Sequence, residues 1–388
     1  MQYRKFGRCG FQVSALGFGT MRLPTDNKIN ERTGDRFSGN IVESEAIRMI
    51  RYAIDNGVNY VDTAYGYHEG YSEVVTGRAL KDGYRDRVYL ATKSPVWLVD
   101  KPEDFDRLLD EQLKKLQTDH IDCYLLHSLS RDTWENRVLK HNLIGKGEAA
   151  KKAGKIRYFG FSFHDNLNTF KEIVDYYDSW DFCQIQYNYM DINNQAGTEG
   201  LKYAASKGLG VVIMEPLLGG RLAKPPKYVL SVFASSGRKD SPAAWAFKWL
   251  WDQPEVSVVL SGMSTMQQVQ ENIKIADESG IGMFTSEDHG TIEKVRACFE
   301  NRTIIPCTKC RYCMPCPNNV DIPGNFELYN ETVIFDDLET PRNSYKHFFD
   351  DENRADKCIG CGSCEEKCPQ HIRISEWMPK VHALLSAE

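Results

Sequence analysis

Eight of the twelve cysteines lie in two short runs near the C-terminal end of the chain. The first run reads Cys307-Thr-Lys-Cys310-Arg-Tyr-Cys313-Met-Pro-Cys316-Pro317, and the second reads Cys358-Ile-Gly-Cys361-Gly-Ser-Cys364-Glu-Glu-Lys-Cys368-Pro369. A disulfide framework would spread its cysteines through a small fold, whereas thiolates two residues apart can converge on one inorganic centre. The spacing therefore predicts metal chemistry, with these eight cysteines as the ligands.

The second run has the spacing C-x2-C-x2-C-x3-C-P, which is typical of bacterial ferredoxins. In that pattern three cysteines bind one [4Fe–4S] cubane and the fourth, just before proline, binds the other. We therefore assign one cluster to Cys307, Cys310, Cys313 and Cys368, and the other to Cys358, Cys361, Cys364 and Cys316. The first run has two residues rather than three before its last cysteine, so the crossover is irregular there. Two zinc sites, or one functional cluster with a degenerate partner, are the alternatives.

A second group of reactive side chains lies where apolar segments end, and consists of Asp62, Tyr67, Lys93 and His127. Together they suit the reduction of a carbonyl group. A tyrosine with a pKa of about 10 is a poor acid–base catalyst near neutrality. We expect the Lys93 ammonium to lower the pKa of Tyr67, while Asp62 keeps Lys93 charged and His127 orients the carbonyl oxygen. Each residue alone has a structural explanation, so the interpretation depends on their joint occurrence.

These side chains need strands that end at one opening. Eight apolar runs are predicted strands: Ala15–Gly19, Asn59–Asp62, Val88–Thr92, Ile121–Leu126, Tyr158–Ser162, Phe182–Gln186, Gly210–Met214 and Val256–Leu260. Helical patterns alternate with them, among them Glu43–Asn56, Glu103–Leu116, Leu167–Tyr177, Gly197–Ser206, Pro242–Trp251 and Met266–Ala276. This alternation predicts a (β/α)8 TIM barrel with its active site at the C-terminal ends of the strands. A doubly wound sheet is the competitor, but the G-x-G-x-x-G turn after the first strand is absent.

The chain is predicted to have two domains. Residues 1–282 form the α/β barrel, and residues 283–388 form a small, mainly α-helical ferredoxin-like domain with a connecting helix. Segments 324–335 and 344–357, between the cysteine runs, read as helical. Loops 22–40 and 219–241 follow the first and seventh strands, so they are expected over the barrel mouth.

Charge and hydropathy exclude several partners. The net charge of −6 gives no reason to expect nucleic acid, and no apolar run approaches the length that spans a bilayer. The first residues lack the apolar core of a signal peptide, so a cytoplasmic location is expected. Ten Asp or Glu against four Lys or Arg lie between Val320 and Lys357. This acidic stretch is a solvated face or the docking surface of a basic redox partner.

Residues 1 to about 280 resemble the aldo-keto reductase family. Asp62, Tyr67, Lys93 and His127 match its catalytic tetrad in identity, order and approximate spacing. The resemblance extends to the segments Leu16–Thr20, Phe159–Ser162, Gln184, Glu215–Leu217 and Ser261–Asn272, and to a hairpin at Gln2–Val13 that closes the barrel bottom. The whole chain resembles members that carry a C-terminal ferredoxin-like domain. This resemblance implies that the protein is an oxidoreductase that acts on a small carbonyl/alcohol pair with NADH or NADPH.

In the family the dinucleotide lies across the barrel mouth, and the resemblance implies which residues contact it: Gly19, Thr20, Ser162, Gln184, Met214, Ser261, Gly262, Ser264, Gln268 and Asn272. Four positions depart from the family pattern. Phe163 replaces the carboxamide-binding asparagine, and Met214 replaces the aromatic residue that stacks on nicotinamide. Gly262 and Gln268 replace cations that grip the 2′-phosphate, so the preference for NADPH over NADH should be weak or reversed.

Two alternatives follow from the presence of clusters. Hydride transfer moves two electrons together, whereas a cluster passes one at a time, so coupling them calls for a flavin. The chain is then a ferredoxin-linked oxidoreductase, with or without a flavin, that takes electrons from a redox partner protein at its C-terminal domain. The second alternative is a non-catalytic electron-transfer subunit, which the intact set of four polar residues disfavours.

Overall fold

The computed structural model describes residues 1–26 and 40–387, and these residues form two compact units. The first unit contains residues 1–26, 40–223 and 240–286. The second contains residues 224–239 and 287–387. Of the predicted loop 22–40, residues 27–39 lie outside the described part of the chain.

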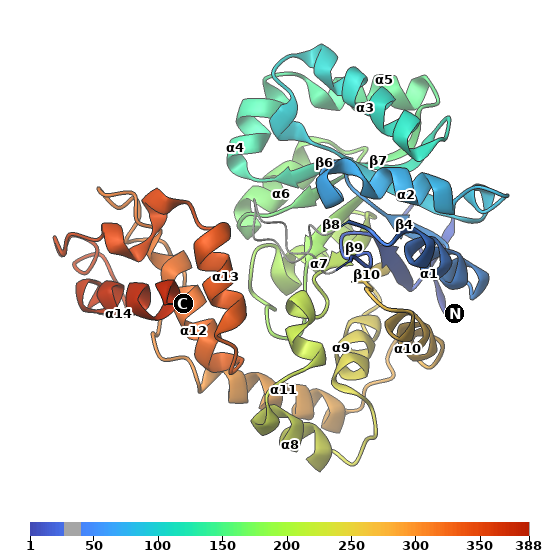
Figure 1. The fold of residues 1–388 in the computed structure, drawn as a ribbon. Helices are drawn as coiled ribbons and strands as arrows, with labels where there is room; N and C mark the ends of the chain where they lie inside the picture. Colours follow the sequence, from blue (N-terminus) through green and yellow to red (C-terminus); the bar gives the residue numbers. More distant parts are fainter. Residues whose placement is uncertain (27–39, 388) are drawn as a thin grey trace. The chain divides into compact units, whose positions relative to one another are not determined.

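The first unit is a closed barrel of eight parallel strands, which confirms the predicted (β/α)8 fold (Figure 1). The strands follow the order β10-β3-β4-β5-β6-β7-β8-β9 around the barrel. Their bounds are Leu16–Gly19 (β3), Tyr60–Asp62 (β4), Tyr89–Ser94 (β5), Ile121–Leu129 (β6), Ile156–Phe163 (β7), Phe182–Gln186 (β8), Gly210–Met214 (β9) and Val258–Gly262 (β10). Strand β5 runs beyond its predicted end because its parallel pairing with β6 continues through Lys93 and Ser94. Strand β6 extends to Leu129 because it pairs again with β7 at Phe163, after a shift in register.

Helices alternate with these strands in the sequence, as predicted. They are α1 (Glu43–Asp55), α2 (Ser72–Ala79), α3 (Pro102–Leu116), α4 (Arg131–Thr133), α5 (Leu143–Lys152), α6 (Leu167–Tyr176), α7 (Gly197–Ser206), α9 (Pro242–Trp251) and α10 (Met266–Asp277). Local chemistry sets several of their starts. The Asn166 side chain accepts a hydrogen bond from Thr169 N before α6, and Ser241 does the same for Ala244 N before α9.

The predicted hairpin closes one end of the barrel. Strands β1 (Tyr3–Lys5) and β2 (Gln12–Ser14) pair antiparallel. Phe6, between them, is fully buried, and its ring lies 5.3 Å from that of Phe182 and 5.9 Å from that of Tyr60. This aromatic plug fills the bottom of the barrel and leaves the opposite end for chemistry.

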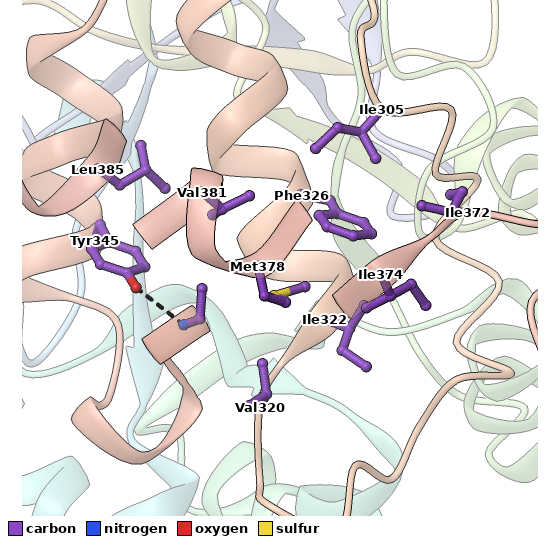
Figure 2. Packing of buried hydrophobic residues seen from close by; sticks show 11 residues of the cluster. Ile305, Val320, Ile322, Phe326, Tyr345, Ile372, Ile374, Met378, Val381 and Leu385 are labelled. Carbon is purple, nitrogen blue, oxygen red and sulfur yellow. Dashed lines mark hydrogen bonds between the residues drawn. The ribbon is translucent and has the colours of Figure 1, made fainter. Parts of the chain in front are cut away.

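All regular elements described in the second unit are helical: α8 (Lys227–Ser235), α11 (Ser286–Glu300), α12 (Ile322–Ile334), α13 (Glu339–His347) and α14 (Ile374–Ser386). Figure 2 shows its buried core, where α12 contributes Phe326 and α14 contributes Met378, Val381 and Leu385. Residues 224–239, within the predicted loop 219–241, belong to this unit, and Tyr228 OH donates a hydrogen bond to the carbonyl of Ile334.

The predicted helix over 344–357 is only partly present. Helix α13 ends at His347, and two short 3-10 turns follow, Asp351–Asn353 and Ala355–Lys357. The Arg354 guanidinium donates hydrogen bonds to the carbonyls of Tyr345 and Lys346, which would otherwise be unsatisfied at the helix end. The Tyr345 hydroxyl in turn accepts from Ala355 N at 3.1 Å (Figure 2). Within the described residues, no helix is long and apolar enough to cross a membrane.

Candidate functional site

Strand alternation places the predicted site residues at the top of the barrel. One buried interior layer contains Tyr60, Ala91, Leu125, Phe182 and Val212. Because side chains two residues apart share a face of a strand, the next inward position on each strand lies closer to its C-terminal end. Those positions are Asp62, Lys93, His127, Gln184 and Met214. The alternation therefore brings five predicted site residues to one end of the barrel.

Lys93 lies at the centre of this group and is fully buried. Its Nζ donates hydrogen bonds to Asp62 Oδ1 at 2.6 Å and to the carbonyl of Thr63 at 2.8 Å. The same Nζ is 5.1 Å from the centre of the Tyr67 ring. Burial lowers the pKa of Lys93, but Asp62 and Tyr67 raise it more, so its net pKa is above the usual value. Lys93 is accordingly a fixed ammonium beside Tyr67.

The expectation that Lys93 lowers the net pKa of Tyr67 was wrong. Burial raises the pKa of Tyr67 above its usual value, and the lowering effect of Lys93 does not offset it. A buried phenolate loses its hydration, and the nearby Asp62 carboxylate opposes a second negative charge. Tyr67 is therefore held as a protonated phenol, the form in which it can donate a proton.

His127 also lies beside Tyr67. The two rings are 6.2 Å apart and nearly perpendicular, and the Trp97 ring lies 5.1 Å from His127. Burial, and then the Lys93 ammonium, hold the pKa of His127 well below its usual value, so this imidazole is neutral. Its Nδ1 is buried and has no hydrogen-bond partner among the described residues. A neutral imidazole with a free nitrogen can bind the oxygen of a substrate.

A β-bulge sets the direction of His127. The register between β6 and β7 shifts between Leu126 and Leu129, and Ser128 adopts a left-handed φ of 58°. The Ser162 hydroxyl accepts a hydrogen bond from Ser128 N at 2.7 Å. Ser162 thus holds the bulge as well as lying on the strand next to it.

The residues expected at a nicotinamide ring are partly brought together. Gln184 Nε2 donates to Met214 Sδ at 3.5 Å, which is a weak contact, and Gln184 Oε1 is buried without a partner among the described residues. Such an oxygen fits the amide N–H group of a carboxamide. Phe163 is fully buried and packs on Phe170 of α6 at 5.1 Å. Its side chain therefore lies outside the strands of the barrel.

The residues expected at the adenosine end lie around the end of β10 and the start of α10. Asn272 Nδ2 donates to Ser261 Oγ at 3.0 Å. Gln268 Oε1 accepts from Ser264 N at 2.7 Å and caps α10. Gly19, at the end of the paired strand β3, packs close to Ser261. Thr20 is buried, and its hydroxyl donates to the carbonyl of Asp62, so it supports the tetrad rather than facing the mouth.

The structure brings the eight clustered cysteines together around two hollows, in the two groups that the spacing predicts. One hollow is lined by Cys307, Cys310, Cys313 and Cys368, and the other by Cys316, Cys358, Cys361 and Cys364. Ile322 of α12 lines both. The irregular spacing before Cys316 therefore does not prevent the crossover.

The cysteine hollows fit a body larger than one ion. A zinc site needs four ligands at about 2.3 Å from one ion. Within residues 1–26 and 40–387, no three His, Cys, Asp or Glu side chains converge closely enough to hold a single metal ion. Apolar side chains such as Ile322 and Phe326 complete the walls of the first hollow. Four thiol groups around an apolar hollow suit a cubane, whose thiolates bind different iron atoms.

Comparison with known proteins decides the family. Residues 15–297 match the model of the aldo/keto reductase family, which covers most of the chain. The chain belongs to the aldo/keto reductase family. The members of this family, including the relatives described below, are oxidoreductases, and residues 306–372 match the model of a 4Fe-4S dicluster domain.

Several relatives are similar to this aldo/keto reductase over most of its length. L-galactose dehydrogenase of Arabidopsis thaliana is 28% identical in an alignment of 326 residues that covers 77% of this chain and 95% of that protein. Protein Tas of Escherichia coli is 26% identical over 71% of this chain and 92% of its own length. The holo form of aldo-keto reductase AKR11C1 from Bacillus halodurans is 26% identical over 76% of this chain and 96% of its own, with a TM-score of 0.61.

One residue of this aldo/keto reductase that the sequence did not single out is Arg22. Its side chain crosses the end of β10 so closely that a Cβ on Gly262 would lie 3.3 Å from its stem. Its Nη1 donates to the carbonyl of Gly219 at 2.6 Å, and its own carbonyl accepts from Ser264 Oγ at 2.8 Å. Arg22 thus brings a cation beside the position where Gly262 lacks one.

A buried polar network behind the tetrad was also missed. Glu73 of α2 is fully buried and accepts hydrogen bonds from Thr92 Oγ1 at 2.7 Å and from Gln112 Nε2 at 2.6 Å. Gln112 Nε2 also donates to the carbonyl of Lys93 at 3.0 Å. The signal available in the sequence was Ser72-Glu73, a polar pair at the start of a short apolar helix. These contacts fix the backbone that carries Lys93.

Proposed function

We propose that this protein reduces a small carbonyl compound with NADH or NADPH, in a barrel fused to a unit with two [4Fe–4S] clusters. The arrangement of Lys93 between Asp62 and Tyr67, with neutral His127 beside Tyr67, carries the proposal. It places a protonated phenol and a neutral imidazole at the mouth of a barrel, where substrates of this fold bind.

Each residue then has a distinct task. Tyr67 donates a proton to the carbonyl oxygen, and the Lys93 ammonium stabilises the phenolate that this leaves. Asp62 keeps Lys93 charged and in place through the 2.6 Å contact. His127 binds and orients the carbonyl oxygen, with the Trp97 ring as an apolar wall beside it.

The nicotinamide end of the cofactor fits Gln184 and Ser162. Gln184 Oε1, which has no partner among the described residues, would accept from the carboxamide, and the Ser162 hydroxyl, which accepts from Ser128 N, would still have its proton to donate. A bound reduced nicotinamide supplies the hydride. Ser261, Ser264 and Asn272 would hold the adenosine end, and Gly19 would leave room beside them.

We expect the rate of reduction to be flat between about pH 6.5 and 10. Tyr67 must be protonated to act as the acid, and its raised pKa keeps it so throughout this range. His127 must be neutral, and its pKa well below the usual value delays its protonation to more acidic conditions. The measurement is kcat/KM against pH. A limb centred inside this window would contradict the assigned protonation states.

Arg22 is expected to favour the phosphorylated cofactor, despite the absence of cations at Gly262 and Gln268. Replacing Arg22 with Gln should weaken 2′,5′-ADP binding by about tenfold or more, because charge-assisted hydrogen bonds to phosphate are lost. Binding of ADP, which lacks the 2′-phosphate, should change little. Calorimetric titration of both nucleotides checks this, with Arg48→Gln on the outer surface of α1 as the control. An equal loss for both nucleotides contradicts a contact with the 2′-phosphate.

A ferredoxin-linked reaction is the second candidate function. The two cysteine hollows favour it, because two clusters form a path for single electrons that hydride chemistry does not need. Cys310 and Cys361 are exposed, so each hollow has an edge that a redox partner protein can reach. A flavin near Met214 would then be required to join one-electron and two-electron chemistry.

Anaerobic titration with NADH and NADPH separates the two functions. The cluster absorbance is followed in the visible range, while nucleotide binding is followed by fluorescence. Binding without bleaching is expected for the carbonyl reductase whose clusters are structural or serve another donor. Bleaching indicates that hydride is split into single electrons inside the protein, which requires a bound flavin.

The domain boundary near residue 282 and the cytoplasmic location stay predictions.

A further inference from the structure

The two cysteine runs fold alike but differ in one respect. In each run the residues just before and just after the second cysteine adopt a left-handed conformation. In the second run they are Gly360 and Gly362, with φ of 68° and 77°. In the first run they are Lys309 and Arg311, with φ of 56° and 61°. Glycine fits this conformation without strain, whereas a residue with a Cβ does not.

Only one of these two residues lines a cysteine hollow. Arg311 is among the residues that line the hollow of Cys307, Cys310, Cys313 and Cys368. Its carboxylate partner, Asp321, lies 3.6 Å away and is not among those lining residues. Arg311 therefore brings a positive charge to the edge of this hollow, on a side chain that is 61% exposed.

Lys309 differs from Arg311 in this respect. Its Nζ donates to Glu327 Oε1 at 2.6 Å, and neither residue lines the hollow. The hollow of Cys316, Cys358, Cys361 and Cys364 has no charged side chain among its described lining residues. The two hollows are thus electrostatically unequal.

We propose that Arg311 gives the cluster held by Cys307, Cys310, Cys313 and Cys368 the higher reduction potential of the two. The inference rests on the proposed pair of clusters. One-electron reduction adds one negative charge to a cluster, and a positive charge at the edge of its site favours the reduced form. An electron delivered by a low-potential one-electron donor therefore comes to rest on this cluster.

The test is a redox titration of the full chain, purified without oxygen and reduced with dithionite, followed by electron paramagnetic resonance. Two midpoints are expected for the unchanged protein. In Arg311→Gly the higher midpoint should fall by about 59 mV or more, a tenfold change for one electron. The lower midpoint should stay in place, and Arg311→Lys should recover most of the shift.

Lys309→Gly is the matched control, because it relieves the same backbone strain and removes a cation that does not line the hollow. It should leave both midpoints nearly unchanged. A single midpoint for both clusters, an equal shift in the two glycine variants, or movement of the lower midpoint overturns the proposal. If the iron-loaded protein gives no [4Fe–4S] signal at all, the proposed clusters themselves are overturned. If Arg311→Gly gives two normal signals at the midpoints of the unchanged protein, only the role of Arg311 is overturned.

Discussion

Replacing Tyr67 with Phe should lower kcat/KM for carbonyl reduction by about 10²- to 10⁴-fold, the usual contribution of a general acid. The change removes only the hydroxyl that is held protonated beside Lys93 and leaves the ring against His127. Cofactor affinity should stay within about twofold, because the proposed nucleotide contacts lie on other strands. Steady-state kinetics and nucleotide titration measure the two quantities.

The iron content of the Tyr67→Phe variant should equal that of the unchanged protein, since the cysteine hollows belong to the second compact unit. Tyr65→Phe is a suitable control, because the Tyr65 hydroxyl bonds to Glu111 rather than to the tetrad. Retained turnover in Tyr67→Phe would remove Tyr67 from the role of acid.

Replacing Cys316 with Ser should remove the cluster of the second run, although Cys316 belongs to the first run in the sequence. About half of the iron should be lost, because one of two clusters loses a ligand. The reason is the grouping of Cys316 with Cys358, Cys361 and Cys364 around one hollow. Iron analysis and electron paramagnetic resonance measure the loss.

Pairs of substitutions make this second prediction sharper. Cys316→Ser combined with Cys361→Ser should lose no more iron than either alone, because both remove the same cluster. Cys316→Ser combined with Cys310→Ser should lose nearly all of it. Cys298→Ser, whose cysteine is in α11 and lines neither hollow, is the control and should keep all iron. If the Cys316/Cys361 double variant lost nearly all iron and the Cys316/Cys310 double variant lost only about half, Cys316 would belong to the cluster of its own run.

Much of the fold was predictable because local sequence patterns determine the positions of its strands and helices. Strands β8 and β9 have the predicted bounds, since short β-rich apolar runs between helices leave little choice. Period-two alternation was enough to bring Asp62, Lys93 and His127 to one end of the barrel. The end of the helix in segment 344–357 was harder to predict. Arg354 contacts a carbonyl at the end of that helix, and the hydrophobic pattern does not reveal this contact.

Properties that depend on neighbours in three dimensions could not be predicted from the sequence. The net pKa of Tyr67 is set by burial, which outweighs the lysine that sequence order identifies. Arg22 meets Gly262 across 240 positions of the chain, so their contact leaves no local signal. In the sequence Glu73 resembles an ordinary helix residue, and only the packing of α2 shows its hydrogen bonds with Thr92 and Gln112.

The most direct test of the proposed reductase follows a deuterium label. The protein, purified without oxygen, is given NADPH or NADH deuterated at nicotinamide C4 on one face, together with a simple aldehyde such as benzaldehyde, and the alcohol is examined by mass spectrometry. We expect one deuterium at the former carbonyl carbon with one of the two labelled faces, and labelling at least about a hundredfold slower in the Tyr67→Phe variant. Alcohol that forms only with a reduced one-electron donor, and carries no label from either nucleotide, would contradict it.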